Sequence, residues 1–392
     1  MRKNWPILLL VVVLGIGIAG CVLLYRAGHR DIHQAAARGD LKRMKAWMSI
    51  GVRPTALDDE GRAPLHNATM ARRRHVIDFL VSRGVDVDIT TDQGTTALMM
   101  AARSGHLPIM QQLLDLGADP NLGDEFEGTA LSWAAHNANH LAVTRLLIEH
   151  GANVKAVMYT DMQTQGGRLV GDPTTATTPL YESVLWGERT EVTDLLIEAG
   201  ANYTIHVAAR VGDVEAIQRM LDEGVAADAV GPYGKTPLHD AADEGHVGVT
   251  RLLLDSGADP GALDNSGRSP LHAAASSENG RTAELLLDAG ADVDLRADNA
   301  DTPLHMAAEL GYPRVTAVLL EAGADPNAVG GGGRTPIHNP CFNSSPQVVK
   351  LLIEFGADIN ARTEIGETPL DYAEAKGDTE CARLLVAAGA RE

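Results

Sequence analysis

Five histidines occupy one position of a recurring four-residue sequence, and histidine is both a common zinc ligand and the side chain that titrates nearest to neutral pH. They are His66, His239, His272, His305 and His338. Copies of one structural unit would place these histidines in a row on neighbouring helices. Packed helices lie about 8–10 Å apart, whereas zinc needs nitrogen ligands at about 2.1 Å, so neighbouring copies cannot share an ion. We therefore expect no metal site at these histidines.

Other sequence signals of catalysis or nucleotide binding are absent or incomplete. Gly330–Gly333 followed by Arg334 resembles a phosphate-binding loop only loosely, because the Gly-Lys-Ser/Thr ending of such loops is missing. The chain has no G-x-S-x-G or H-E-x-x-H sequence. Its three cysteines exclude a disulfide framework, and Cys341 and Cys381 are expected to be small core residues. We predict no catalytic residues, no metal and no cofactor.

The elements that carry the histidines are copies of one unit. We take as the anchor of each copy the apolar residue at the third position of its Thr-Pro-Leu-like turn. Eight of the ten gaps between successive anchors are 33 residues, and the exceptions are 49, from Leu131 to Leu180, and 25, from Leu180 to Ile205. Such a period is typical of a solenoid, in which a unit buries its apolar face only against its neighbours. The anchors are Ile32, Leu65, Leu98, Leu131, Leu180, Ile205, Leu238, Leu271, Leu304, Ile337 and Leu370.

The copy that begins at Thr236 shows why each unit forms a helical hairpin. Threonine is a good N-cap, and Pro237 takes the first helical position, where its missing N–H is not needed. Gly245 is able to adopt the left-handed conformation that ends this first helix, and residues 247–255 supply a second helix. The Asp-, Asn-, Pro- and Gly-rich stretch before the next threonine predicts an extended segment and turn, which we call the finger.

The 33-residue period and the sequence Thr-Pro-Leu-His resemble the ankyrin repeat. TPLH begins at residues 236 and 302, and variants of it begin at residues 63, 269 and 335. The resemblance covers about eleven units over residues 31–392. It implies an all-α solenoid of stacked helix-turn-helix units with β-turn fingers. It also implies that each histidine of this sequence hydrogen-bonds the neighbouring backbone.

The two irregular gaps lie side by side and predict how the array is divided. We expect a first block over residues 31–204, with a long finger insert at 152–177, and a second block over residues 205–392 with a C-terminal cap. The finger before Ile205 is too short for the usual turn, so the stack is expected to bend or divide there. The insert is interpreted either as a solvent-facing finger that tolerates extra residues or as a recognition loop.

Ankyrin-like arrays usually bind partners through finger positions −6, −5 and −3 and through helix positions +5 and +6, counted from the anchor. These positions form the concave face of the stack. In this chain they include rigid aromatic side chains and carboxylates, which are typical of an interface that takes an apolar and basic partner surface. The predicted partner-binding residues are Phe126, Trp186, Tyr233, Asp243, Glu244, Glu309 and Phe342, with Met158 and Tyr159 in the insert.

The first thirty residues predict a membrane attachment. Residues 6–25 are apolar or small, and the 19 residues from Ile7 to Tyr25 would span about 28 Å as a helix, which is close to the thickness of the hydrocarbon layer. Residues 18–21 resemble the lipobox of bacterial lipoproteins, which makes Cys21 a lipidation candidate. Residues 22–25 stay apolar, as in an uncleaved signal anchor. Both interpretations stay open. The lipobox favours a bacterial protein whose repeats face the periplasm, and the basic residues after the span leave a cytoplasmic orientation open.

Charge narrows the class of partner. The formal net charge is −19, and the residues after position 30 carry 29 basic against 52 acidic side chains, so nucleic acid is an unsuitable ligand. The leading hypothesis is a non-enzymatic, membrane-tethered scaffold that binds a protein on its concave face. The alternatives are an inhibitor or immunity protein that caps a toxin or hydrolase, and an enzyme that uses the insert as a lid.

Overall fold

A computed structural model describes residues 31–135, 140–159, 162–165, 168–171, 176–185 and 190–391. The chain divides into two compact units. The first runs to residue 172 and includes 177–183 and 190–201, and the second runs from residue 202 onward and includes Val184 and Leu185. Within the described ranges, no helix is long and apolar enough to cross a membrane. The predicted membrane segment at 6–25 and the lipidation candidate Cys21 lie outside these ranges and stay predictions.

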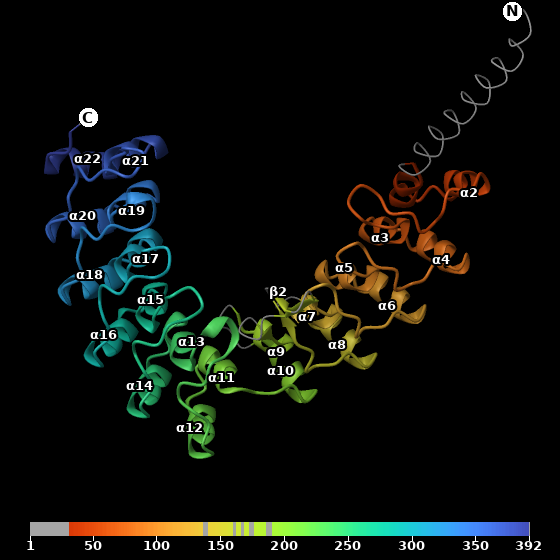
Figure 1. Cartoon of the computed structure of the whole chain (residues 1–392), viewed down its shortest axis with the longest axis horizontal. Coiled ribbons are helices and arrows are strands. Elements are labelled where there is room, and N and C mark those ends of the chain that lie inside the picture. Colours follow the sequence, from red (N-terminus) through yellow and green to blue (C-terminus); the bar gives the residue numbers. More distant parts are fainter. Residues whose placement is uncertain are drawn as a thin grey trace, which may run out of the picture. The chain divides into compact units, whose positions relative to one another are not determined.

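Each unit is a row of helix pairs joined by fingers (Figure 1). In the first unit, residues 31–38 are helical and are followed by α2 (Leu41–Ser49), α3 (Pro64–Met70), α4 (Arg74–Ser82), α5 (Ala97–Arg103), α6 (Leu107–Asp115), α7 (Ala130–Ala135), α8 (Leu141–Glu149), α9 (Pro179–Glu182) and α10 (Glu191–Glu198). The second unit contains α11 (Ile205–Val211), α12 (Val214–Asp222), α13 (Pro237–Asp243), α14 (Val247–Asp255), α15 (Pro270–Ala275), α16 (Gly280–Asp288), α17 (Pro303–Leu310), α18 (Pro313–Glu321), α19 (His338–Phe342), α20 (Pro346–Glu354), α21 (Pro369–Lys376) and α22 (Thr379–Ala388).

The local rules read from the sequence explain these boundaries. Thr236 is extended, with φ −93° and ψ 164°, and Pro237 then opens α13. Gly245 follows the helix with φ +72°, which an L side chain adopts only with strain, and α14 begins two residues later. The mostly helical solenoid predicted from the sequence is confirmed.

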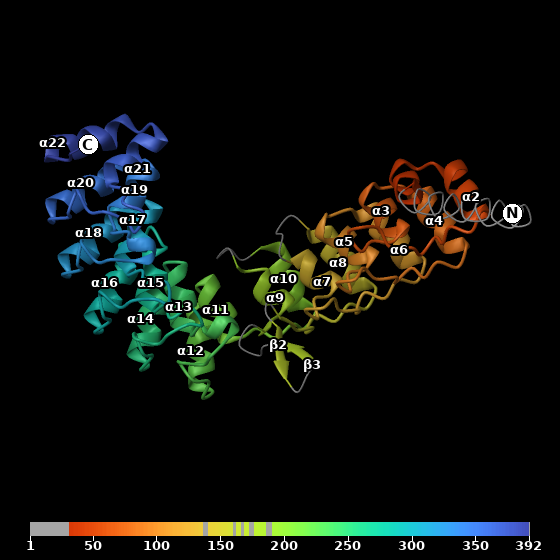
Figure 2. The same ribbon diagram turned by 45° about the horizontal axis from the view of Figure 1, so that its top comes forward.

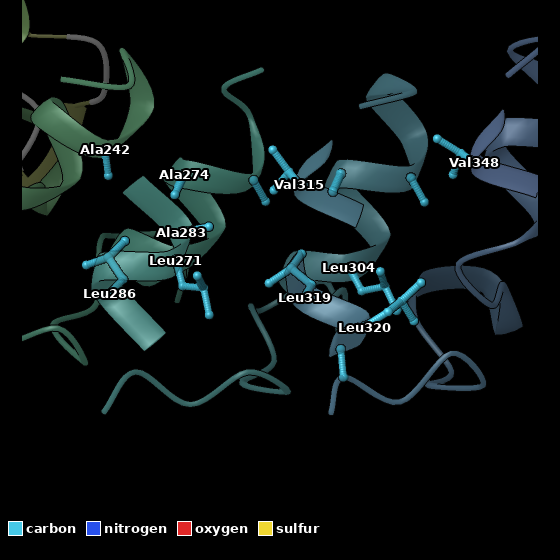
Figure 3. Close-up of a cluster of buried hydrophobic side chains, with 14 of the residues drawn as sticks. Ala242, Leu271, Ala274, Ala283, Leu286, Leu304, Val315, Leu319, Leu320 and Val348 are labelled. Atoms are coloured by element: carbon cyan, nitrogen blue, oxygen red, sulfur yellow. The ribbon is translucent and has the colours of Figure 1, made fainter. Parts of the chain in front are cut away.

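Stacking buries a layer of leucine, valine and alanine side chains between successive repeats. Figure 3 shows part of this layer in the second unit, where Leu271, Leu286 and Leu304 lie among alanines and valines of neighbouring helices. All three leucines are fully buried. The alanines let the helices approach closely, and full burial of each leucine stabilises the fold by about 1.5–3 kcal/mol. Cys341 and Cys381 are also buried, which confirms that they are small core residues.

Four of the recurring histidines tie their own repeat to the next one. His272 Nδ1 accepts a hydrogen bond from Ser269 N–H at 3.1 Å, and its Nε2–H donates to the carbonyl oxygen of Asp301, in the next finger, at 3.2 Å. His66, His239 and His305 make the same pair of bonds in their own repeats. The Nδ1 atom of His338 likewise accepts from Thr335 N–H at 3.0 Å. The predicted bond to the neighbouring backbone is thus confirmed for four of the five histidines. Burial lowers the pKa of all five histidines, to about 4 for His272, so the imidazoles are neutral.

The long finger contains strands that the sequence did not predict. They are β1 (Met158–Tyr159), β2 (Met162–Gln165), β3 (Arg168–Gly171) and β4 (Ala176–Thr177). Strands β2 and β3 pair in antiparallel register, from Met162 opposite Gly171 to Gln165 opposite Arg168. In Figure 2 this hairpin projects away from helices α7, α9 and α10 of the same unit. A projecting hairpin fits either interpretation of the insert. The predicted bounds of the insert and of the two blocks stay predictions.

Candidate protein-binding surface

The last three repeats form a groove of about 440 Å³. Its walls come from helices α17, α19 and α21 and from the fingers that precede α19 and α21. Many of the lining residues occupy repeat positions −3, +5 and +6, which are among those that the ankyrin resemblance implies for binding. Two of them, Glu309 and Phe342, are predicted partner-binding residues. The lining residues are Glu309, Arg334, Asn339, Phe342, Asn343, Glu367, Asp371, Tyr372 and Ala375.

Aromatic rings form one side of this groove. Phe342 ends α19, and 44% of its surface is exposed. Its ring meets that of Tyr372, on α21, edge to face with the centroids 6.3 Å apart. The ring of His338 also meets Tyr372 edge to face, with the centroids 5.3 Å apart. Lys376, at the end of α21, places its ammonium nitrogen 4.8 Å from the centroid of Phe342. The exposed phenylalanine is therefore held by its neighbours and already accepts a cation on its ring.

Three carboxylates line the groove together with the rings, and they differ in how the protein uses them. Asp371 accepts hydrogen bonds from the backbone N–H and the hydroxyl of Thr368, and these bonds lower its pKa. It therefore caps α21 as an ionised side chain. Glu309 and Glu367 are exposed, and within the described part of the chain no hydrogen bond or ion pair engages their carboxylates. Two of the three carboxylates are thus available to a ligand.

The guanidinium of Arg334 is the cation among the residues that line the groove, and it is engaged within the protein. Its Nε–H donates to the carbonyl oxygen of Gly331 at 3.0 Å, and one terminal nitrogen lies 3.4 Å from the amide oxygen of Asn339. Arg334 therefore fixes the shape of its own finger, which is the glycine-rich segment that loosely resembled a phosphate loop. The groove keeps an excess of negative charge.

Residues at position +5 of one repeat lie beside residues at position +2 of the next. Arg103 and Trp133 form one such pair, with the guanidinium carbon 5.0 Å from the ring centroid. Arg210 and Asp240 form a second, at 3.2 Å between nitrogen and oxygen, and Phe342 with Tyr372 forms a third. Where position +5 is an arginine, position +2 thus offers an aromatic ring or a carboxylate. Sequence reasoning missed Trp133 and Tyr372 because it examined only −6, −5, −3, +5 and +6.

The predicted residues Asp243 and Glu244 belong to an ion network around Arg210. This arginine is only 3% exposed, and it pairs with Asp240, Asp243 and Glu244 while donating to the backbone carbonyls of Val184 and Leu185. A buried guanidinium needs such partners, because its desolvation is otherwise strongly unfavourable. Both carboxylates are therefore occupied within the protein, and their proposed contact with a partner stays a prediction.

Burial sets the protonation of this network. It raises the pKa of Glu244 to about 7, even though the charge of Arg210 acts in the opposite direction. Burial acts to raise the pKa of Asp240 too, but the hydrogen bond from His206 and the charges of His206 and Arg210 outweigh it and lower that pKa. Asp240 is therefore the ionised counterion of Arg210, and Glu244 titrates near neutral pH.

Tyr233 lies at a finger of the second unit, in the short 3-10 helix η2 (Pro232–Gly234). Its backbone has φ +60°, which is unusual for a residue other than glycine, and its carbonyl oxygen accepts a hydrogen bond from Asn265 N–H in the next finger. The ring is half-buried. The structure therefore fixes the backbone of Tyr233 firmly, whereas its role in binding stays a prediction.

Three further predicted residues, Phe126, Met158 and Tyr159, lie in the first unit. Tyr159 N–H donates to the carbonyl oxygen of Phe126 at 2.8 Å, so the first strand of the insert, which also holds Met158, follows the preceding finger. Phe126 is 36% exposed, and Met158 and Tyr159 are half-buried. Trp186, the remaining predicted aromatic, lies outside the described residues.

Stacked helix pairs with variable side chains on fingers and first helices define a solenoid repeat protein. A family model described as ankyrin repeats in three copies matches residues 32–124, 108–205, 190–264, 251–330 and 304–391. These matches cover nearly the whole chain after residue 31, and the chain belongs to the ankyrin-repeat family. Ankyrin repeats generally bind other proteins and are not enzymes.

Similar proteins match over part of their length. Neurogenic locus notch homolog protein 2 of Homo sapiens is 35% identical over 129 residues, which is 33% of this chain and 5% of that protein. Neurogenic locus notch homolog protein 1 of Xenopus laevis is 33% identical over the same length. The putative palmitoyltransferase ZDHHC13 of Danio rerio is 32% identical over 221 residues, or 53% of this chain and 32% of that protein. The chain therefore spans at most a third of the length of these relatives. The palmitoyltransferase activity in the last name is that of the Danio rerio protein.

Proposed function

We propose that this chain is a non-enzymatic scaffold that binds a partner protein through the groove at Phe342 and the neighbouring finger and helix positions. The observation that carries the proposal is an exposed aromatic ring, fixed by Tyr372 and flanked by two carboxylates that the described part of the protein leaves unengaged. Rigid aromatic side chains with few rotamers are typical anchors of protein interfaces. A partner with apolar and basic side chains would suit this surface.

The scaffold would be held at a membrane by residues 6–25 or by an acylated Cys21. The support for tethering is the apolar length of this segment, and the support for export in a bacterium, with the repeats in the periplasm, is the small-residue sequence before Cys21. The intact mass of the mature protein distinguishes the two anchors. A mass that includes Met1 would identify the uncleaved anchor, and an acylated chain that begins at Cys21 would identify the lipoprotein.

Affinity capture from detergent-solubilised membranes tests the binding proposal. Three forms of the full chain serve as bait: the unmodified chain, the double variant Tyr233→Asp and Phe342→Asp, and the control variant Phe355→Asp. Phe355 is 42% exposed, close to the 44% of Phe342, and lies at the end of α20 outside the groove. We expect a protein that the unmodified and control baits capture equally and that the double variant loses.

The identity of the captured protein decides what the scaffold does. An enzyme or toxin whose activity falls when the chain is added would favour the inhibitor or immunity alternative, whereas components of a larger assembly would favour a scaffold. Equal capture by all three baits would place recognition elsewhere, and would contradict the groove as the binding surface.

A further inference from the structure

The groove beside Phe342 combines two features that favour one kind of ligand. It offers the face of an exposed aromatic ring, which attracts cations, and it offers the carboxylates of Glu309 and Glu367, which no described side chain pairs. Carboxylates at the edge of an aromatic face suit a positively charged group with an apolar stem. Lysine and arginine side chains have this composition.

The protein itself shows that a cation is accepted at this place. Lys376 holds its ammonium 4.8 Å from the centre of the Phe342 ring, and it does so from an exposed position at the end of α21. Elsewhere in the array, the equivalent +5 and +2 positions hold an arginine against a ring, as in Arg103 with Trp133, or against a carboxylate, as in Arg210 with Asp240. In the groove, both positions are aromatic, so neither of them supplies a guanidinium.

We propose that the groove binds the guanidinium of an arginine side chain on the partner protein, between the ring of Phe342 and the carboxylates of Glu309 and Glu367. Arginine suits this arrangement better than lysine because its planar guanidinium stacks on aromatic rings and donates to two carboxylates at once. This inference rests on the proposed function, because it specifies which side chain of the partner enters the groove.

The other charged groups of the groove define what the incoming arginine meets. Asp371 is engaged with Thr368, and Arg334 is held by Gly331 and Asn339, so neither has to move. Lys376 is the competitor, because it occupies the ring face that the guanidinium needs. Removal of its charge is therefore expected to strengthen binding, the opposite of what removal of a carboxylate does.

A fluorine label makes binding at this single ring visible. The chain has four phenylalanines, Phe79, Phe126, Phe342 and Phe355, so the full chain with fluorophenylalanine gives four resonances, and the variant Phe342→Leu assigns one of them. The probes are capped Gly-Arg-Gly, Gly-Lys-Gly and Gly-citrulline-Gly. Citrulline has nearly the shape of arginine without its charge. We expect Gly-Arg-Gly to shift the Phe342 resonance with half-saturation at about 1–10 mM, as for a single anchoring side chain.

The variants test each part of the arrangement on exposed residues that are not needed for packing. The double variant Glu309→Gln and Glu367→Gln is expected to weaken Gly-Arg-Gly binding at least 5-fold. The variant Lys376→Gln is expected to strengthen this binding 2- to 5-fold. Both expectations follow from the strength of one exposed charge or cation–π contact, which is about 0.5–1 kcal/mol each. Glu321→Gln, at an exposed carboxylate on α18 outside the groove, is the matched control and is expected to leave binding unchanged. The other three resonances report that each variant is folded.

The proposal is supported if citrulline binds at least 5-fold more weakly than arginine, lysine binds more weakly than arginine, and the two kinds of variant act in opposite directions. It is overturned if Gly-Arg-Gly leaves the Phe342 resonance unchanged, if citrulline binds equally well, or if Phe355 shifts as much as Phe342. If the peptides fail while partner capture is still lost in the double variant Tyr233→Asp and Phe342→Asp, the arginine site is wrong and the scaffold proposal stands. If the peptides bind and no partner is captured, the groove binds arginine and the scaffold proposal is wrong.

Discussion

The substitution His272→Gln isolates the contribution of one inter-repeat histidine to acid stability. His272 occupies position N3 of the capping box, where glutamate and glutamine are the usual residues. The side-chain oxygen of glutamine would therefore replace Nδ1 as the acceptor for Ser269 N–H. It cannot repeat the Nε2–H bond to the carbonyl oxygen of Asp301. That oxygen keeps a second hydrogen bond, from Ala297 N–H at 3.0 Å. We expect the variant to lose about 1 kcal/mol of unfolding free energy at pH 7.

The pH dependence follows from the lowered pKa of His272. In the folded protein this pKa is about 4, against 6.5 in the unfolded chain, so the unfolded chain binds more protons between these values. The stability that the neutral His272 contributes to the fold is therefore fully present above pH 6.5 and is lost as the pH falls toward 4. Between pH 7 and pH 4.5 this one group lowers the free energy of unfolding by about 2 kcal/mol.

Urea unfolding followed by circular dichroism at pH 7 and pH 4.5 measures both effects. Carboxylates titrate in this range in both proteins, so the informative quantity is the difference between wild type and His272→Gln in their loss of stability. We expect wild type to lose about 2 kcal/mol more than the variant. His239→Gln, which removes the same pair of bonds in another repeat, should repeat the result. An equal loss in wild type and both variants would refute the account of the histidines as neutral inter-repeat links.

Three further substitutions test other parts of the structure by the same urea assay. Glu244→Gln should raise the free energy of unfolding at pH 8 by up to about 3 kcal/mol. The folded pKa of Glu244 is about 7, so an ionised Glu244 destabilises the folded protein at pH 8, and the gain should vanish by pH 4.5, where the folded protein holds Glu244 protonated. Ala300→Gly should stabilise by about 1 kcal/mol, because Ala300 has φ +66° at a finger position that most other repeats give to glycine; a loss would contradict the assigned backbone. Leu286→Ala should cost about 2–5 kcal/mol, and a change below 1 kcal/mol would contradict its full burial.

The repeated parts of the fold follow from local chemistry and were readable from the sequence. A threonine cap, a proline at the first helical position and a glycine with positive φ each act within a few residues, so the pattern around Thr236 predicted α13 and α14 and their ends. The role of the histidines followed from the family resemblance. The hairpin β2–β3 did not follow, because its alternation is short and lies in a segment with no repeated counterpart.

The candidate site was predictable only in part. Repeat positions identified Glu309 and Phe342, because both occupy position +5, one of the positions that the ankyrin resemblance implies for binding. Tyr372 and Trp133 were missed, since contact between positions +5 and +2 depends on how one repeat packs on the next. The ion network of Arg210 was missed for the same reason. Its carboxylates lie 30 or more residues from Arg210 in the sequence, and their pairing depends on burial that a sequence pattern does not report.

The dissociation constant of the captured partner for the purified full chain tests the central claim most directly. Isothermal titration would compare the unmodified chain with Phe342→Asp and with the control Phe355→Asp, whose phenylalanine has nearly the same exposure outside the groove. If the groove is the binding surface, Phe342→Asp weakens binding at least 30-fold, equivalent to about 2 kcal/mol, as for the loss of an interface anchor, and the control stays within 3-fold. Equal affinities for all three proteins would contradict the claim.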